Sequence, residues 1–493
     1  MREYEQGMYL RLTVLSISLS AGVFAQGLAG KVEALAAASP VASRGHWGAQ
    51  FIDLATGEVI FSRNENSFFV PASNTKLFST ALALMRLGPT HRQLTRLVGM
   101  RPLGPDGVLH GELRLIGGGD PTLSGRPLPY DPKAKFGEPL AALDELAEQA
   151  WQGGLRRVDG DIAGDDSLYL WEPYPGGWAV DDTKFSYGAP VSALMLHDNT
   201  VSLRLEGGAE AGQPARITIS PTPGYWTIES RVRTAVPAAG VHLEREPGSR
   251  QIELWGTIAP RRARVFSLAV DDPAQYAAFA MREALERRGI AVFGGVTAYH
   301  RHPLMSAAAE TVGAVEFARR LSPPMLETLR VIDKVSQNLQ AEAVLLEVAR
   351  LRGKAPGRDG AMEELRAFLD EIGIPSEDYN FEDGSGLSRL TLITPATVIR
   401  LLRFMHASPH AEAFRSLLPH GGVDGTLDDR FKRLKGAVIL AKTGSLSHTA
   451  ALSGYIERPD RSPLAFSVMV NNANARGAAL REFIDKLVLT ILE

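Results

Sequence analysis

The chain has 493 residues, of which 45% are hydrophobic and 22% are charged, and its formal net charge is −3. This length exceeds one compact core, so we expect two or three domains of ordinary globular composition. A near-neutral charge without a long basic block argues against nucleic-acid binding, and the absence of cysteine excludes disulfides, thiolate metal sites, a cysteine nucleophile and a lipidated N-terminal cysteine.

The first predicted element is a secretory signal peptide over residues 1–30. Arg2 and Arg11 precede an uncharged apolar run, LTVLSISLSAGVF, and small residues follow it. This order is typical of an export signal, and the run is shorter than the ~20 residues of a membrane span. The lack of charge over residues 12–30 disfavours an amphipathic starter helix. We therefore expect a periplasmic or otherwise extracytoplasmic protein without a stable membrane span after cleavage.

Residues 31–92 are predicted as the first part of a discontinuous domain. A small-residue linker over 34–42 precedes two strands, 48–53 and 58–62, which a turn at Ala-Thr-Gly joins. The segment PASNTKLFSTALALMRLGP has the apolar spacing of a helix, and its Gly-Pro end is a typical stop.

The remaining chain is predicted to contain a β-rich insertion and the second part of that domain. Residues 93–305 carry short alternating segments such as GELRLIG and VSLRLEG, which indicate more than one β-rich module, and helical patterns return near 274–288. Helical patterns dominate from 315 onward. The chain ends in three strands and an amphipathic helix, so residues 306–493 should complete the sheet begun by the first hairpin. The strands are predicted at 437–442, 451–456 and 464–470, and the buried stripe of the helix is Leu480, Phe483, Ile484, Leu487, Val488 and Ile491.

Ser73 and Lys76 form a Ser-x-x-Lys motif at the start of the predicted helix. A spacing of three places both side chains on one helix face. The lysine amine can then take the proton that makes the serine hydroxyl nucleophilic, once burial or a second cation favours the neutral amine. The positive helix N-terminus favours the developing alkoxide. Such spacings also arise by chance, so a helix-start serine with a solvated lysine stays open.

Ser336 and Asn338 form a Ser-x-Asn motif. Residues two apart do not share a helix face, so the pair fits a turn between the helical patterns that end near Arg330 and begin near Leu339. The serine hydroxyl can relay a proton to a leaving amine, and the amide can hold a substrate backbone. A second match at 62–64 precedes the nucleophile and is interpreted as chance.

Lys442, Thr443 and Gly444 form a Lys-Thr-Gly motif at the end of the strand GAVILAK, and Ser445 follows them. Glycine permits close backbone approach, and an extended peptide can pair along a strand edge. Lys442 supplies the second cation, and the hydroxyls of Thr443 and Ser445 suit a terminal carboxylate. Alone, this motif is equally typical of a turn after a strand.

The three motifs in this order are the signature of penicillin-binding proteins and class A β-lactamases. A long insertion separates Ser73 from Ser336, whereas β-lactamases and small carboxypeptidases place these motifs much closer. With PASNTK, GGGDPTL, YGAPVSAL, DGSGLSR and AKTGSLS, nearly the whole mature chain resembles the D-alanyl-D-alanine carboxypeptidase/endopeptidase family (class C low-molecular-mass penicillin-binding proteins, peptidase family S13).

The resemblance implies a serine β-lactamase/transpeptidase-like catalytic domain, α/β (α+β) and discontinuous, with a large β-rich insertion. It implies that Ser73 is acylated by peptidoglycan stem peptides and by β-lactams, with Lys76 as base and no cofactor or metal. Ser336 and Asn338 would serve the leaving group and substrate backbone, Lys442 and Thr443 the carboxylate, and the Ser73 and Ser445 N–H groups the oxyanion hole. The expected residues for the amine of the stem peptide are Trp178, Asp181, Asp182, Tyr187 and Leu446.

Some positions depart from the family pattern, and some alternatives stay open. Leu390-Thr391 stands where an asparagine is expected, and His448 occupies an often small position near the third motif. Asp181 and Asp182 are equally typical of a turn cap. A zinc hydrolase is disfavoured because His300 and His302 lie in a turn-like segment without a third ligand, and a Ser-His-Asp hydrolase because Gly-x-Ser-x-Gly is missing. A β-lactamase and a non-catalytic peptidoglycan-binding relative remain.

Overall fold

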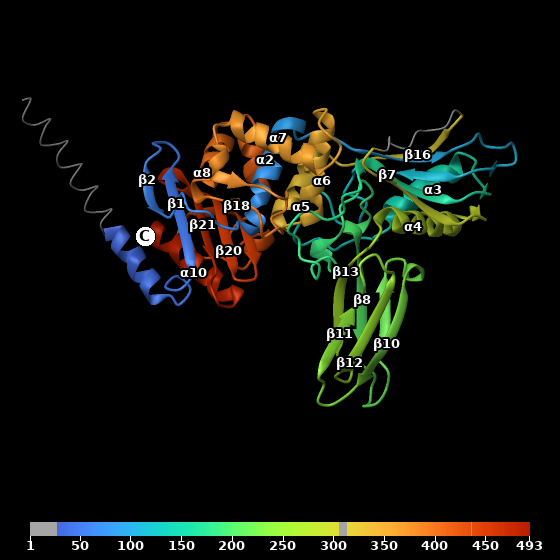
Figure 1. Ribbon diagram of the computed structural model, residues 1–493, viewed down its shortest axis with the longest axis horizontal. Helices are drawn as coiled ribbons and strands as arrows, with labels where there is room; N and C mark the ends of the chain where they lie inside the picture. Colours follow the sequence, from blue (N-terminus) through green and yellow to red (C-terminus); the bar gives the residue numbers. More distant parts are fainter. Residues whose placement is uncertain (1–26, 305–312, 435) are drawn as a thin grey trace, which may run out of the picture. The chain divides into compact units, whose positions relative to one another are not determined.

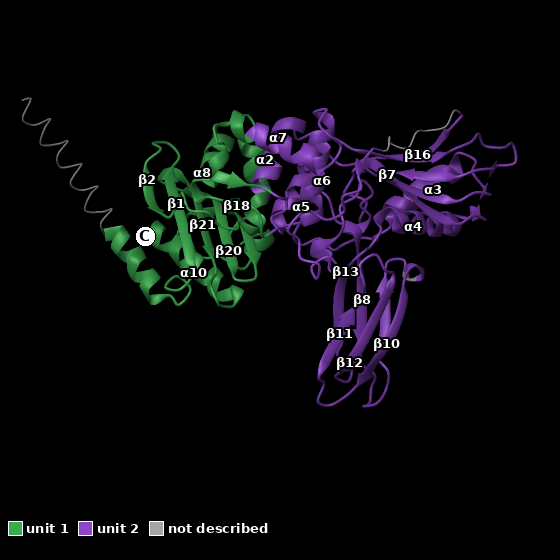
Figure 2. Cartoon of the chain, viewed as in Figure 1, with its two compact units in different colours: residues 1–75, 369–381, 389–493 green, residues 76–368, 382–388 purple. Residues whose placement is uncertain are grey.

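The computed structural model describes residues 27–304, 313–434 and 436–493. Most of the predicted signal peptide, residues 1–26, lies outside the described residues. The chain forms two compact units, and each collects segments far apart in sequence (Figure 2). Unit 1 contains the chain up to Thr75, Leu369–Phe381 and Arg389–Glu493, and unit 2 contains Lys76–Phe368 and Glu382–Ser388. The expected domain boundaries near 92 and 305 stay a prediction.

Unit 1 is built on one five-stranded antiparallel sheet with the strand order β19-β20-β21-β1-β2 (Figure 1). The first hairpin and the last three strands therefore share a sheet, as predicted. Helices α8 and α10 pack on it, and every residue of the predicted α10 stripe is buried. The bounds are β1 His46–Asp53, β2 Val59–Arg63, β19 Val438–Leu446, β20 Thr449–Arg458, β21 Arg461–Asn471, α8 Pro395–Ala407 and α10 Gly477–Leu492. The smaller elements here are β17 Tyr379–Asn380, β18 Leu392–Ile393 and α9 Ala411–Leu417.

The predicted linker over 34–42 is wrong, because residues 27–38 are helical. Leu28, Val32 and Ala36 recur every four residues, so they share one helix face, and all three are buried in the core that contains the α10 stripe. Val41 joins the same core. The small residues were read as a flexible spacer, although alanine is the strongest helix former.

The helices of unit 2 that carry two of the motifs pack against one another: α2 (Lys76–Leu87) contacts both α5 (Met325–Lys334) and α6 (Asn338–Leu351). The predicted stop of α2 is confirmed, since Gly88 adopts a left-handed φ of 75°. A further helix, α7 (Arg358–Glu371), crosses the unit boundary. Within the described residues, no helix combines the length and the apolar character needed to cross a bilayer.

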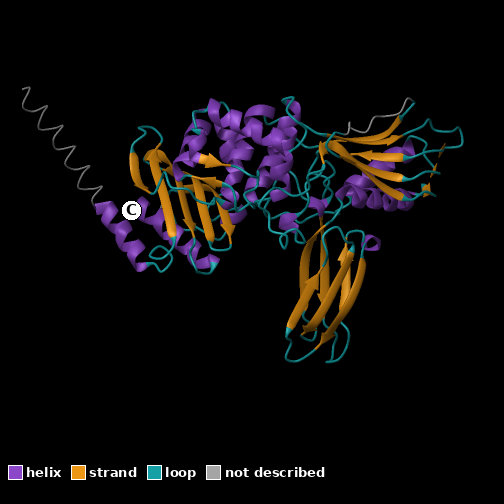
Figure 3. Cartoon of the chain, in the orientation of Figure 1, coloured by secondary structure: helices purple, strands orange, loops and turns teal. Residues whose placement is uncertain are grey.

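The insertion is β-rich and contains several sheets (Figure 3). Buried apolar residues from these sheets form one core cluster. Residues 141–152 form a helix, α3, whose Leu143, Leu146 and Ala150 line a buried face. One expectation fails: residues 315–321, where helical patterns were predicted to begin, form a strand, β16, that pairs with β3. One sheet contains β3 Leu94–Gly99, β5 Leu113–Ile116, β7 Ile162–Leu170, β15 Val296–Arg301 and β16 Val315–Leu321. The others contain β4 Val108–Leu109, β6 Arg157–Val158 and β14 Ala291–Val292; β8 Thr200–Glu206, β9 Arg216–Ser220 and β13 Ala263–Ala269; and β10 Thr227–Thr234, β11 Gly240–Glu244 and β12 Gln251–Ile258. The helices are α3 Ala141–Gln152 and α4 Pro273–Arg288.

Candidate active site

Ser73 lies in a short 3₁₀ turn (Ala72–Thr75) that packs against strand β19 in unit 1. Its neighbour Asn74 is fully buried and donates from Nδ2 to the Lys442 carbonyl oxygen at 3.0 Å. A Cβ atom at Gly444 would lie 2.6 Å from the Pro71 carbonyl oxygen. Glycine at 444 is therefore required for the turn to approach the strand this closely.

The third motif lies inside β19 and not at its end, because the strand continues to Leu446. A turn after a strand is thereby excluded for these residues. Lys442 is fully buried and donates from Nζ to the Thr443 carbonyl oxygen at 2.9 Å. The Thr443 hydroxyl donates to the Thr426 hydroxyl at 2.8 Å. Thr426 carries no sequence signal, and only the fold places it beside the motif.

β19 is an edge strand of the sheet, and among the described residues an isolated bridge between His420 and Leu440 lies beyond it. Within the described residues, the segment from Lys442 to Leu446 pairs with β20 alone. Ser445 is exposed and Leu446 half-buried. His448 lies in the turn to β20 with a φ of 64°, is exposed, and has its Nδ1 3.2 Å from the Ala473 carbonyl oxygen.

In unit 2, Lys76 of the first motif contacts Asn338 of the second motif. The fully buried Lys76 donates from Nζ to Asn338 Oδ1 and to the Ser385 carbonyl oxygen, each at 2.6 Å. Asn338 in turn donates from Nδ2 to the Tyr187 carbonyl oxygen at 2.7 Å. Ser336 lies between α5 and α6, as predicted, with a left-handed φ of 63°. Such a backbone is uncommon for a residue with a side chain and marks a constrained turn.

The residues of unit 2 that are expected to bind the amine of the stem peptide have different neighbours. Tyr187 lines a cavity of about 390 Å³ with Ser336 and Asn338, and its hydroxyl donates to Asp182 Oδ1 at 3.0 Å. Burial, together with the carboxylate of Asp182, raises the pKa of Tyr187 to about 12. Trp178 donates from Nε1 to Asp383 Oδ2 at 3.1 Å.

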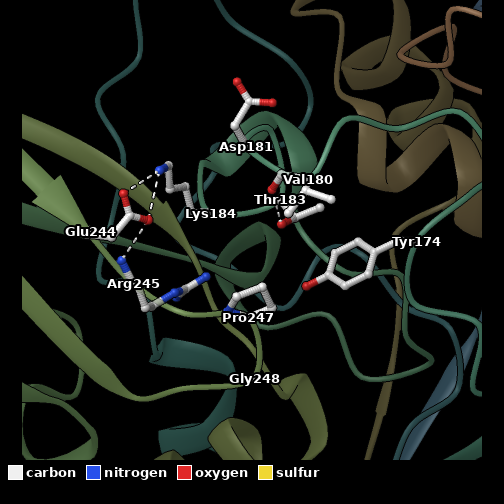
Figure 4. Close-up of a pocket in the computed structure, with 9 residues that line it drawn as sticks. All are labelled: Tyr174, Val180, Asp181, Thr183, Lys184, Glu244, Arg245, Pro247 and Gly248. Carbon is white, nitrogen blue, oxygen red and sulfur yellow. Dashed lines mark hydrogen bonds and ion pairs between the residues drawn. The ribbon is translucent and has the colours of Figure 1, made fainter.

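Asp181 lines a separate cavity (Figure 4), although its charge also contributes to the raised pKa of Tyr187. That cavity also contains Tyr174, Lys184, Glu244 and Arg245, and Lys184 donates to Glu244 Oε1 at 3.0 Å. The sequence therefore grouped two adjacent aspartates whose side chains have different neighbours.

A charged group beside the second motif was missed by the sequence reasoning. Arg126 Nη2 lies 2.6 Å from Asp198 Oδ2, and Gln340 donates from Nε2 to Asp198 Oδ1 at 2.8 Å. Arg126 and Asp198 line the same cavity as Ser336. No local pattern announces this pair, because 72 residues separate its members.

His300 lies in β15 and not in a turn, which corrects the reading of this segment. Its Nδ1 is 2.9 Å from Asp166 Oδ1, and its Nε2 is 3.4 Å from Asp272 Oδ2. Burial opposes the charged imidazole, but the hydrogen bonds and charges of Asp166 and Asp272 outweigh it and raise the pKa of His300 to about 10. In residues 27–304, 313–434 and 436–493, no group of three or more His, Cys, Asp or Glu side chains is arranged to hold a metal ion.

Comparison with known proteins finds D-alanyl-D-alanine carboxypeptidases. A D-alanyl-D-alanine carboxypeptidase of Actinomadura sp. (strain R39) is 32% identical over 447 residues, which cover 88% of this chain and 79% of the relative. D-alanyl-D-alanine carboxypeptidase DacB of Haemophilus influenzae is 25% identical over 84% of this chain and 83% of its own length.

Solved structures share the fold. The crystal structure of penicillin binding protein 4 (dacB) from Haemophilus influenzae matches with a TM-score of 0.77 and 21% identity, over 94% of this chain and 99% of that chain. The same protein complexed with a novel β-lactam matches with a TM-score of 0.72 and 21% identity, over 93% and 98% of the two chains. A family model described as the D-Ala-D-Ala carboxypeptidase 3 (S13) family matches residues 28–491. The predicted resemblance is confirmed: the chain belongs to the D-Ala-D-Ala carboxypeptidase 3 (S13) family.

Proposed function

We propose that this protein is a serine-type D-Ala-D-Ala carboxypeptidase, a DD-endopeptidase, or both, acting on peptidoglycan stem peptides through an acyl-enzyme at Ser73. The observation that carries the proposal is the pair of 2.6 Å hydrogen bonds from Lys76 Nζ to Asn338 Oδ1 and to the Ser385 carbonyl oxygen. A lysine head group held by two acceptors in a buried site is preorganised for proton transfer, whereas a solvated lysine is not.

The proposed reaction begins with transfer of the Ser73 hydroxyl proton to neutral Lys76. Ser73 Oγ attacks the carbonyl carbon of the penultimate D-alanine, and the N–H groups of Ser73 and Ser445 stabilise the oxyanion. The C–N bond breaks as Ser336 relays a proton to the departing amine, and water then hydrolyses the ester. In a β-lactam, Ser73 opens the ring amide and forms the corresponding ester.

Substrate binding is assigned to residues of β19 and to Asn338. Lys442, Thr443 and Ser445 would bind the terminal carboxylate through charge and hydroxyl donors. The contacts of the buried Lys442 and of the Thr443 hydroxyl support this role, because they fix the positions of both side chains on β19. Asn338 and the backbone at Gly444 would hold the peptide chain.

Amine recognition is assigned to the residues that the family resemblance implies. Asp182 is the strongest candidate, because the Tyr187 hydroxyl orients its carboxylate near Asn338. Trp178, Asp181, Tyr187 and Leu446 complete the proposed set. Because the substrate is peptidoglycan, we propose an extracytoplasmic location, to which the predicted signal peptide also points.

Labelling with a fluorescent penicillin tests the nucleophile. Wild-type protein should form a covalent adduct that survives denaturation, and Ser73→Ala should form none. Covalent labelling of Ser73→Ala would show that another residue is acylated. Absence of labelling in folded wild-type protein would favour a non-catalytic relative.

Product analysis then separates the activities. Purified protein incubated with pentapeptide and with crosslinked muropeptides should release D-alanine, cleave crosslinks, or both. Rapid nitrocefin turnover without peptide cleavage would instead indicate a β-lactamase.

A further inference from the structure

The turn at residues 382–388 belongs to unit 2, although the chain on both sides of it belongs to unit 1. It lies tightly against α2 and α6. Ser79 on α2 donates from Oγ to the Gly384 carbonyl oxygen at 2.6 Å. A Cβ atom at Gly384 would lie 2.5 Å from Leu345 Cδ1 and 3.1 Å from the Ala341 carbonyl oxygen, both on α6. The turn is therefore held at a fixed depth between the two helices.

Glu342 on α6 binds the backbone of this turn. Its side chain is buried, and both carboxylate oxygens accept from Gly384 N at 3.0 Å. Oε1 also accepts from Ser385 N at 2.8 Å. Buried backbone N–H groups require such acceptors, so the carboxylate and the turn stabilise each other.

Ser385 connects this carboxylate to the base of the proposed reaction. Its N–H group is bound by Glu342, and its carbonyl oxygen accepts from Lys76 Nζ at 2.6 Å. Asn338, the other acceptor of Lys76, precedes Glu342 by four residues on α6. Residues four apart share a helix face. One face of α6 thus holds Lys76 twice, directly through Asn338 and indirectly through the Ser385 peptide.

We propose that Glu342 is a positioning residue for Lys76, and that its ionised carboxylate fixes the Ser385 carbonyl oxygen where it orients the lysine amine. This proposal rests on the proposed function, because its kinetic test measures acylation of Ser73. Glu342 itself touches neither substrate nor the reacting atoms.

The surroundings of Glu342 make this support sensitive to pH. Burial, and then the charge of Asp383 on the turn, raise the pKa of Glu342 to about 7, while Arg358 at the start of α7 opposes the rise. Lys76 on α2 faces it through the Ser385 peptide. Above about pH 7 the carboxylate accepts all three N–H contacts. Below that pH one oxygen carries a proton and accepts poorly, so the hold on the turn weakens.

The kinetic test compares Glu342→Gln with a matched control, Glu347→Gln. Gln keeps the volume and one acceptor oxygen but carries no charge. Glu347 lies on the same helix, is equally buried, and contacts His91 and Arg350 instead of the turn. Stopped-flow acylation by benzylpenicillin, from pH 5.5 to 9, separates the limiting acylation rate from the initial binding constant.

At pH 8.5, Glu342→Gln should lower the limiting acylation rate about 10- to 100-fold, as expected for a displaced catalytic group, with initial binding unchanged. The ratio of wild-type to variant rate should shrink toward one below about pH 6, because wild-type Glu342 then gains its own proton. A ratio that is constant with pH, a loss in initial binding alone, or an equal loss in Glu347→Gln would overturn the proposal.

A second measurement uses wild-type protein only, so it does not depend on the variant folding. Hydrogen exchange of the peptide containing Gly384 and Ser385, corrected for the intrinsic pH dependence, should show less protection at pH 5.5 than at pH 8.5. Unchanged protection would overturn the proposal even if acylation fails. If folded wild-type protein is not acylated but the protection changes, the proposed function fails and the contact between Glu342 and the turn stands.

Discussion

Two buried charge clusters in unit 2 satisfy their carboxylates in different ways. In the insertion, Asp166 and Asp272 flank the imidazole of His300, and their charges favour its protonated form. Beside Lys76, Glu342 is bound by backbone N–H groups and has a second carboxylate, Asp383, as a charged neighbour. The first arrangement keeps its charge state over a wide pH range, while the second changes near neutrality. We therefore expect the insertion cluster to serve stability and the motif cluster to serve the proposed reaction.

The largest expected effect is on the rate of acylation, after substitution in the motif cluster. Lys76→Gln should reduce penicillin acylation at least about 10³-fold, because it removes the proposed base, and effects of this size are usual for groups that act with a nucleophile. The protein should stay folded, which circular dichroism checks alongside the kinetics. Acylation within tenfold of wild type would show that another group takes the proton.

A substitution in the insertion cluster should affect stability alone. His300→Asn should lower the free energy of unfolding by about 3 kcal/mol, the low end for breaking a buried ion pair, because His300 retains some exposure. Urea unfolding measures this change. The acylation rate of the folded variant should remain within about twofold of wild type. A large loss of acylation in fully folded His300→Asn protein would break the division between the two clusters.

The pH dependence of stability sharpens the same comparison. The pKa of His300 is raised from 6.5 to about 10, so the folded state favours its protonated form. Its contribution is fully present below about pH 6.5 and is lost as the pH rises through about 10. The stability difference between wild type and His300→Asn should therefore shrink across this window. A difference that stays constant from pH 6 to 10 would show that the ion pair is not its source.

A close approach in unit 1 should give a smaller loss. Gly444→Ala would place a Cβ atom 2.6 Å from the Pro71 carbonyl oxygen and 3.2 Å from Ala72 Cβ, so the Ser73 turn must shift. We expect acylation to fall about tenfold or more and stability to fall by about 1–3 kcal/mol. Gly477→Ala is a matched control, because only the far end of Arg481 approaches its Cβ position, at 3.5 Å.

The smallest effect should come from the hydroxyl pair. Thr426→Val removes the partner of the Thr443 hydroxyl but keeps the side-chain shape. We expect KM for a D-Ala-D-Ala peptide to rise a few-fold with kcat nearly unchanged, in line with about 1 kcal/mol for one hydrogen bond. A fall in kcat with KM unchanged would instead place Thr426 in the chemical step.

Sequence reasoning succeeded where local periodicity or a complete motif carried the information. The buried stripe of α10, the shared sheet of the first and last strands, and the turn at Ser336 were all predicted. The resemblance to the S13 family was confirmed as well. In each case the signal lay in spacing along the chain.

What the sequence did not indicate depends on backbone contacts between distant segments. Glu342 reads as an ordinary helix residue, and its partners Gly384 and Ser385 follow about 40 positions later. Thr426 reaches Thr443 only because the fold places a short turn beside β19. The predicted strand at 437–442 ended too early, because β19 continues through the motif to Leu446. The close backbone approach expected at Gly444 is present.

The helix over residues 27–38 has a practical consequence for truncated versions of the protein. Its apolar side shields part of α10, with Leu28 and Val32 in the shared core. A recombinant product that starts at residue 43 would expose apolar surface on α10. Such a product should bind hydrophobic dyes and precipitate more readily than one that retains residue 27 onward.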